Sequence, residues 1–310
     1  MDHETERAAG GGGRVAQEVR RDGASRPCVF YRHRESGRQG GLMDWSTNLH
    51  ATRKREIELI FNGCPPRAFP AALELGAGDG YQSTLLEAYV DRLVLTDMDV
   101  TRILGRRSDR VTVRQCEAEA VGEAFPAAEF DLVFSSNVLD DVPNHGLALR
   151  SGVTVHVIPS PFWKLCSFGL FFPLLIPRGL RYLARRTSLG NGKSALEFPN
   201  NPRMPSNGTS WGQRLWPLPV GPYRGHLDEF WANRKARWVH EFQRAGFRVV
   251  RILKGPVCSG HGLGWERLRR TLERSGLTGE YVYLATKQGR RSPYEKYFPE
   301  NCEHALPGVE

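Results

Sequence analysis

The residues with the clearest chemical purpose are the glycines of the segment Leu73–Gly80, which reads LELGAGDG. A short apolar run leads into this segment, and a helical pattern follows it. Glycines are needed where the chain adopts positive φ values and where a ligand approaches the backbone closely. A helix that begins here would also offer free backbone N–H groups to a polar or anionic part of that ligand. The segment therefore predicts a ligand-binding turn between a strand and a helix.

The spacing of these glycines argues against a dinucleotide-binding loop. Such a loop reads G-x-G-x-x-G and would place its third glycine at position 81. That position is Tyr81, and the third glycine is Gly80. We therefore expect a ligand other than NAD or FAD.

An acidic residue suited to a ribose follows the next strand pattern. Residues Arg92–Thr96 form a short, mostly apolar run that ends in Asp97, about 20 residues after Gly76. A carboxylate at this distance can accept hydrogen bonds from both ribose hydroxyls. The adjacent Met98 suits packing against an adenine face. These two residues predict a nucleoside site next to the glycine turn.

Two further segments complete the pattern. The third strand, Val111–Gln115, leads into Cys116–Glu119, which reads CEAE, and the fourth strand, Phe130–Ser135, leads into SNVL at residues 136–139. Taken in order, the segments resemble the class I S-adenosylmethionine-dependent methyltransferases, in particular the type 11 methyltransferase domain group. The string from Glu74 to Gly80 is similar to motif I of that class, E-x-G-x-G-x-G.

The resemblance implies S-adenosylmethionine as the cofactor. It implies that an acidic residue after the third strand holds the adenine amino group and that the fourth strand lies beneath the methionine part. The cofactor-binding residues that it implies are Glu74, Gly76, Gly78, Gly80, Asp97, Met98, Glu117, Ala118 and Asn137. Glu117 stands where Asp is more usual, and Asp140 and Asp141 stand where members often have Glu-His.

The remaining pattern predicts an α/β fold. Further strands are expected at 152–158, 247–253 and 281–286, and helices at 45–61, 82–89, 230–245 and 265–274. Strands separated by helices or long loops indicate a parallel sheet with crossover connections. We expect a Rossmann-like, seven-stranded, mostly parallel sheet with an antiparallel edge and an insertion after strand 5. The stretch 136–151 is short compared with the full crossover helix that the resemblance implies, but a parallel crossover needs only about a dozen residues, so closure is possible with little helix.

Composition divides the chain into a tail and one methyltransferase domain. Residues 1–42 carry a glycine run and few apolar residues, so they are expected to be a disordered tail, with the domain at 43–310. The six cysteines form no C-x-x-C pair, and the first residues are charged rather than apolar. These features predict a cytoplasmic protein.

The insertion, residues 159–225, offers two interpretations. Its segment 162–186 is an apolar run that ends in basic residues, and the uninterrupted apolar part is too short for a membrane span of about 20 residues. It is either a lid or core element over an acceptor site, or an interfacial element that contacts anionic lipid. The second interpretation predicts peripheral membrane contact.

Two histidines are candidates for a catalytic base. His226 closes the insertion, and His156 lies in the fifth strand. Each also has a structural interpretation, as a loop-surface histidine and a core histidine respectively. No spacing of histidines, cysteines and carboxylates predicts a metal site.

The acceptor is expected to be a small molecule, lipid-like or a glycan, methylated on oxygen or carbon. Asn137 is followed by Val138 and Leu139, not by the Pro-Pro-Tyr sequence typical of methylation at exocyclic base nitrogens. A net charge of +9 favours a nucleic-acid methyltransferase as one alternative, but no nucleic-acid-binding module is visible. The short crossover favours a second, a non-catalytic membrane-associated binding protein that keeps the fold.

Overall fold

The structure is a computed structural model, which describes the sheet, the helices that cover it and most of the loops between them. The described residues are 45–105, 107–126, 129–142, 153–173, 219, 222–258, 265–289 and 291–298. The predicted N-terminal tail lies outside them, as do residues 143–152 of the fourth crossover and 174–218 of the insertion.

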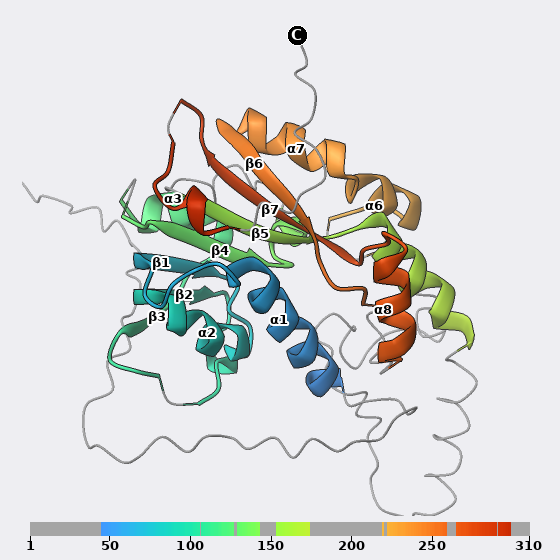
Figure 1. Ribbon diagram of the computed structural model, residues 1–310, viewed down its shortest axis with the longest axis horizontal. Helices are drawn as coiled ribbons and strands as arrows, with labels where there is room; N and C mark the ends of the chain where they lie inside the picture. The colour runs from blue at the N-terminus through green and yellow to red at the C-terminus, as the bar shows by residue number, and fades with distance from the viewer. Residues whose placement is uncertain are drawn as a thin grey trace, which may run out of the picture.

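One seven-stranded sheet runs through the described chain (Figure 1). Its strands are β1 (Phe69–Leu75), β2 (Val90–Asp97), β3 (Val111–Gln115), β4 (Leu132–Ser136), β5 (Val153–Pro159), β6 (Phe247–Lys254) and β7 (Glu280–Lys287). Their order across the sheet is β3-β2-β1-β4-β5-β7-β6. The first five strands are parallel, and β7 is antiparallel to both β5 and β6. The α/β fold with an antiparallel pair at one edge is therefore confirmed.

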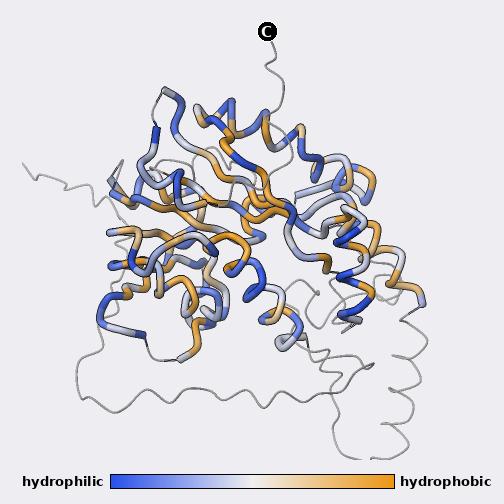
Figure 2. The backbone as a smooth tube through the Cα atoms, viewed as in Figure 1, coloured by the Kyte–Doolittle hydropathy of each residue, from blue (hydrophilic) through white to orange (hydrophobic). Residues whose placement is uncertain are grey.

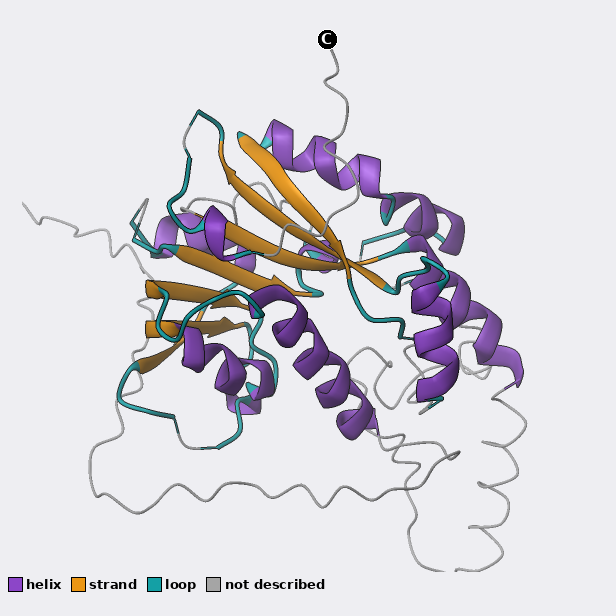
Figure 3. Ribbon diagram, viewed as in Figure 1, coloured by secondary structure: helices purple, strands orange, loops and turns teal. Residues whose placement is uncertain are grey.

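Helices cover both faces of this sheet, which makes a three-layer sandwich (Figure 3). On one face, α1 (Trp45–Phe61) and α2 (Tyr81–Leu86) pack through residues such as Ile60 and Leu86. On the other, α3 (Val121–Ala124) and α7 (Lys235–Arg244) pack through residues such as Val121 and Trp238. The central strands are predominantly apolar, as Figure 2 shows, because parallel strands covered on both faces must bury both.

The helices follow the predicted pattern with three differences. The helix expected at 82–89 is α-helical only from Tyr81 to Leu86 and ends in a 3-10 turn, Glu87–Tyr89, and the short helix α3 was not predicted. The helix expected at 230–245 is two helices, α6 (His226–Ala232) and α7, because Arg234 between them has extended backbone angles. The helix α8 (Glu266–Arg274) forms as expected. Residues 161–173 at the start of the insertion are also helical.

No helix among the described residues is long and apolar enough to cross a bilayer.

Candidate functional site

The glycine turn joins β1 to α2 at the carboxyl edge of the sheet. Gly76, Gly78 and Gly80 have φ values of 65°, 60° and 78°, a region that side-chain-bearing residues avoid. A Cβ on Gly76 would lie 2.4 Å from a methyl of Val138, so that glycine is needed for packing against the chain after β4. A Cβ on Gly78 would have no atom within 4 Å. The backbone at Gly78 is therefore open to a ligand.

Asp97 at the end of β2 is joined directly to this turn. Its side chain is buried, Oδ2 accepts a hydrogen bond from the Gly78 backbone N–H at 2.8 Å, and Oδ1 accepts one from the Asp99 N–H at 2.9 Å. A carboxylate offers about four acceptor sites, so both oxygens keep capacity for hydroxyl donors. Together with the open backbone at Gly78, this arrangement fits the ribose of an S-adenosyl group.

The residues predicted for the adenine lie beside Asp97, at the ends of β2 and β3. Met98 is 69% exposed, Glu117 is exposed and Ala118 is half-buried. The amide of Gln115 donates to the Met98 carbonyl at 2.9 Å, which ties the two strand ends together. These side chains are available to a ligand at this edge, and their contacts with adenine stay a prediction.

Glu74 lies beneath the glycine turn and not at its surface. It is 2% exposed, and burial raises its pKa to about 7, while the Ser83 hydroxyl and the charge of Arg107 oppose that rise. The Arg107 guanidinium also donates to the Gly80 carbonyl at 3.0 Å. Glu74 is thus placed to organise the turn from below, and a direct cofactor contact stays a prediction.

A histidine that sequence reasoning missed contacts the turn from α1. The Nε2 atom of His50 lies 2.6 Å from Oδ2 of Asp79, and the His50 ring stacks on Tyr81 with centroids 4.0 Å apart. Burial acts to raise the pKa of Asp79, but the hydrogen bonds from His50 and the Tyr81 N–H outweigh it and lower the pKa. A carboxylate that holds an imidazole in one orientation is a common arrangement for proton transfer.

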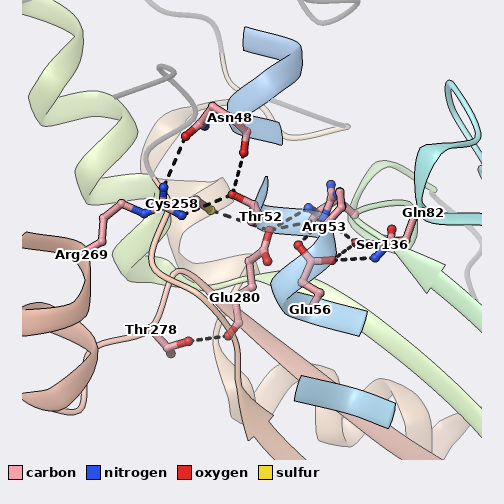
Figure 4. A network of polar contacts seen from close by, with 11 residues as sticks. Asn48, Thr52, Arg53, Glu56, Gln82, Ser136, Cys258, Arg269, Thr278 and Glu280 are labelled. Carbon is pink, nitrogen blue, oxygen red and sulfur yellow. Dashed lines mark hydrogen bonds and ion pairs between the residues drawn. The ribbon is translucent and has the colours of Figure 1, made fainter. Parts of the chain in front are cut away.

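A buried polar network connects α1 with the ends of β4 and β7 (Figure 4). Arg53 donates to Oε1 of Glu56 at 2.8 Å and to the Ser136 hydroxyl, and its Nη1 lies 3.7 Å from Oε1 of Glu280. Asn137, which follows β4 with a φ of 53°, donates through Nδ2 to that same Glu280 oxygen at 2.9 Å. Arg53, Glu56 and Glu280 bring one guanidinium and two carboxyl groups into the protein interior.

A second part of the network fixes α8 against α1. Arg269 is buried and donates to the Val257 carbonyl at 2.7 Å, and longer contacts of 3.4 Å join it to Asn48 and Thr52. The loop at Val257 is thereby held against α1. It places Cys258, which is also buried, 3.8 Å from Oε1 of Glu280.

The two histidines predicted as catalytic bases occupy different environments. His156 is fully buried, its Nδ1 lies 2.7 Å from the Ser135 hydroxyl, and its ring stacks on Phe242 of α7. Burial lowers its pKa to about 3, so it stays neutral, and its position supports the interpretation as a core histidine. His226 is half-buried at the start of α6, with its ring 5.1 Å from that of Phe168. Of the two predicted histidines, we retain His226 as a candidate base.

Among the described residues, no group of three or more histidine, cysteine, aspartate or glutamate side chains is arranged to hold a metal ion.

Comparison with known proteins identifies the domain. Residues 73–155 match the Methyltransf_11 family, described as a methyltransferase domain. No curated protein sequence matches the chain.

Several solved structures are similar to it. One is a Listeria monocytogenes protein assigned as an S-adenosylmethionine-dependent methyltransferase (13% identity, 77% of this chain, 99% of that chain, TM-score 0.43). Another is an S-adenosylmethionine-dependent methyltransferase of Mesorhizobium loti (15% identity, 72% and 93%, TM-score 0.40). A third is the magnesium protoporphyrin IX methyltransferase of Synechocystis PCC 6803 with bound SAH (12% identity, 79% and 86%, TM-score 0.41).

The family match agrees with the sheet order and with the glycine turn at the edge of the sheet. The protein is an enzyme of the class I S-adenosylmethionine-dependent methyltransferases. Its cofactor-binding part is a Methyltransf_11 domain, and its cofactor is S-adenosylmethionine.

Proposed function

We propose that the protein methylates oxygen or carbon of a small-molecule, lipid-like or glycan acceptor. S-adenosylmethionine supplies an electrophilic methyl group on a sulfonium, and the chain's own residues bind and orient the reactants. Gly78 and Asp97 support the adenosine, and Met98, Glu117 and Ala118 border the adenine. Rate would come mainly from positioning and from the exclusion of water.

The observation that carries this proposal is the way α1 closes the end of β4. Arg53 and Glu56 contact Ser136 directly, so buried side chains fill the space beside the strand that precedes Asn137. On the side covered by α1, these side chains limit the space through which an acceptor can reach the end of β4. This restriction favours a compact acceptor group over a base within a duplex. For a hydroxyl acceptor, His226 or the His50–Asp79 pair would take the proton.

Transfer of a radioactive methyl group to cell extract tests the acceptor class. We expect label from methyl-labelled S-adenosylmethionine to enter the organic-soluble or small-metabolite fraction, and its chromatographic migration to report the acceptor. Label recovered in nucleic acid would instead favour a nucleic-acid methyltransferase. Cofactor binding without any transferred label would favour a non-catalytic binding protein.

Peripheral membrane contact is a further part of the proposal, and it is supported by exposed apolar side chains on two helices. Leu165 and Phe172 on the helix at 161–173 are 58% and 38% exposed, and Leu227 and Trp231 on α6 are 75% and 51% exposed. The buried contact of Lys164 with Glu229 holds the two helices together. These residues would place an apolar surface next to lipid.

Replacing Leu227 and Trp231 by serine should therefore reduce co-sedimentation with anionic vesicles. Added salt should weaken the same binding in the wild-type protein. Phe171→Ser is a useful comparison, because that side chain is only 7% exposed and its loss should lower the melting temperature. Wild-type protein that never sediments with vesicles would show that the exposed residues serve another purpose.

A further inference from the structure

Glu280, the first residue of β7, is a buried carboxyl group at the edge of the cofactor site. Its side chain is 3% exposed, and Oε1 accepts a hydrogen bond from Asn137 at 2.9 Å. Its backbone carbonyl accepts hydrogen bonds from the Gly255 N–H and the Thr278 hydroxyl, which fixes the residue in place. The carboxyl group therefore cannot turn away to solvent without breaking these contacts.

Glu56 and Glu280 are close to one another but are not equally stabilised as anions. Both oxygens of Glu56 accept hydrogen bonds, Oε1 from Arg53 and Oε2 from Gln82 and Ser136. Oε2 of Glu280 receives no hydrogen bond from any described donor, and Glu56 lies within hydrogen-bonding reach of the Glu280 carboxyl group. One guanidinium cannot neutralise two buried carboxylates, so Glu56 and Glu280 together retain one proton. That proton resides on Glu280, because Glu280 accepts fewer hydrogen bonds than Glu56.

The groups around Glu280 agree with that assignment. Burial raises the pKa of Glu280 well above its ordinary value, repulsion from Glu56 acts in the same direction, and the charge of Arg53 opposes the rise. Burial also raises the pKa of the Cys258 thiol, which therefore stays neutral beside Glu280. Arg269 faces Cys258 from α8 and is engaged with the Val257 carbonyl. At neutral pH the network thus holds one carboxylate, one guanidinium and one carboxylic acid.

Asn137 links this acid to the cofactor-binding turn. The Asn137 N–H donates to the Val157 carbonyl of β5 at 2.8 Å, and the next residue, Val138, packs against Gly76. Asp97 lies at the end of β2, and the sheet order from there is β2, β1, β4. A cofactor whose ribose is at Asp97 and which crosses the glycine turn of β1 extends toward Asn137 and Glu280.

We propose that Glu280 carries a proton in the free protein and releases it when the positively charged sulfonium of S-adenosylmethionine binds beside Asn137. The inference rests on the proposed placement of the cofactor. S-adenosylhomocysteine has almost the same shape but a neutral thioether, so its binding leaves the proton on Glu280. The residue thereby makes the site respond to the charge that distinguishes the cofactor from its product.

Calorimetry of both ligands measures this proton directly. Titrations at pH 7 in buffers of different ionisation enthalpy should show up to one proton more released per S-adenosylmethionine than per S-adenosylhomocysteine, because only the sulfonium displaces the proton that Glu280 holds in the free protein. As the pH rises above 7, the Kd of S-adenosylmethionine should fall relative to that of S-adenosylhomocysteine, by up to about tenfold per pH unit while Glu280 is mostly protonated, because the ionised fraction rises. The amino acid part shared by both ligands cancels in the comparison.

Glu280→Gln should remove both differences, since the amide that replaces the carboxyl group can still accept from Asn137 but has no proton to release. Glu266→Gln, a change at an exposed position of α8, should preserve them. If the Glu280→Gln protein does not fold, the comparison of the two ligands on the wild-type protein decides the question alone. Equal proton release and equal pH dependence for both ligands would overturn the proposal, as would their unequal release in a folded Glu280→Gln variant. Failure of both ligands to bind would instead contradict the cofactor placement.

Discussion

Replacing Asp97 by alanine is expected to weaken S-adenosylmethionine binding by about 1–3 kcal/mol, or about 5- to 150-fold in Kd. The change removes the carboxylate proposed to accept the ribose hydroxyls. It also leaves the Gly78 N–H without the acceptor that now lies 2.8 Å away, so the turn loses its attachment to β2. Isothermal titration of the wild-type and variant proteins measures the effect.

Asp99 provides the matched control, because it is acidic and two residues away but exposed. Its carboxylate accepts from the Thr101 N–H in a local turn and has no contact with Gly78 in the described structure. Asp99→Ala should therefore leave the affinity nearly unchanged. An Asp97→Ala protein that folds and binds the cofactor as tightly as wild type would contradict the placement of the ribose.

Replacing Arg53 by leucine is expected to lower the free energy of unfolding by about 3–5 kcal/mol, the usual cost of leaving a buried charge without its partner. Glu56 would lose the donor to Oε1, and both buried carboxyl groups would lose the neighbouring positive charge. Chemical denaturation at pH 7 measures the change. The deficit should shrink as the pH falls, because protonation removes the uncompensated charge in the folded variant.

Arg55 lies on the same helix and is the control for this prediction. Its pair with Glu273 has an N–O distance of 2.6 Å, but the two side chains are 29% and 20% exposed. Arg55→Leu should therefore cost about 1 kcal/mol or less. Leucine at both 53 and 56 should be less destabilising than the sum of the two single changes, because the double variant removes the stranded charge of Glu56 as well. Equal losses for Arg53→Leu and Arg55→Leu would show that burial of the network does not govern its energy.

Local pattern was sufficient for most of the fold. Short apolar or β-branched runs placed all seven strands to within a few residues. The signal is clearest for β1, β4 and β5, since a strand covered on both faces has to be apolar along most of its length. The helix Trp45–Phe61 was predicted with its observed bounds, because a helical period and a following proline pair are both local features. The division between α6 and α7 was missed, since it depends on extended backbone angles at Arg234 that the surrounding helical pattern hides.

The amino-acid sequence by itself determined the class of the protein, because the glycine turn and the acid after the second strand are defined by spacing along the chain. Only the tertiary structure decided which side chains meet. Asn137 and Glu280 are 143 positions apart, and Asn48 and Arg269 are 221 apart. Likewise His50 meets Asp79 because α1 packs next to the turn, and His156 is a core residue because α7 covers β5. Periodicity records which face of an element is buried, but the partners on that face depend on how distant elements pack.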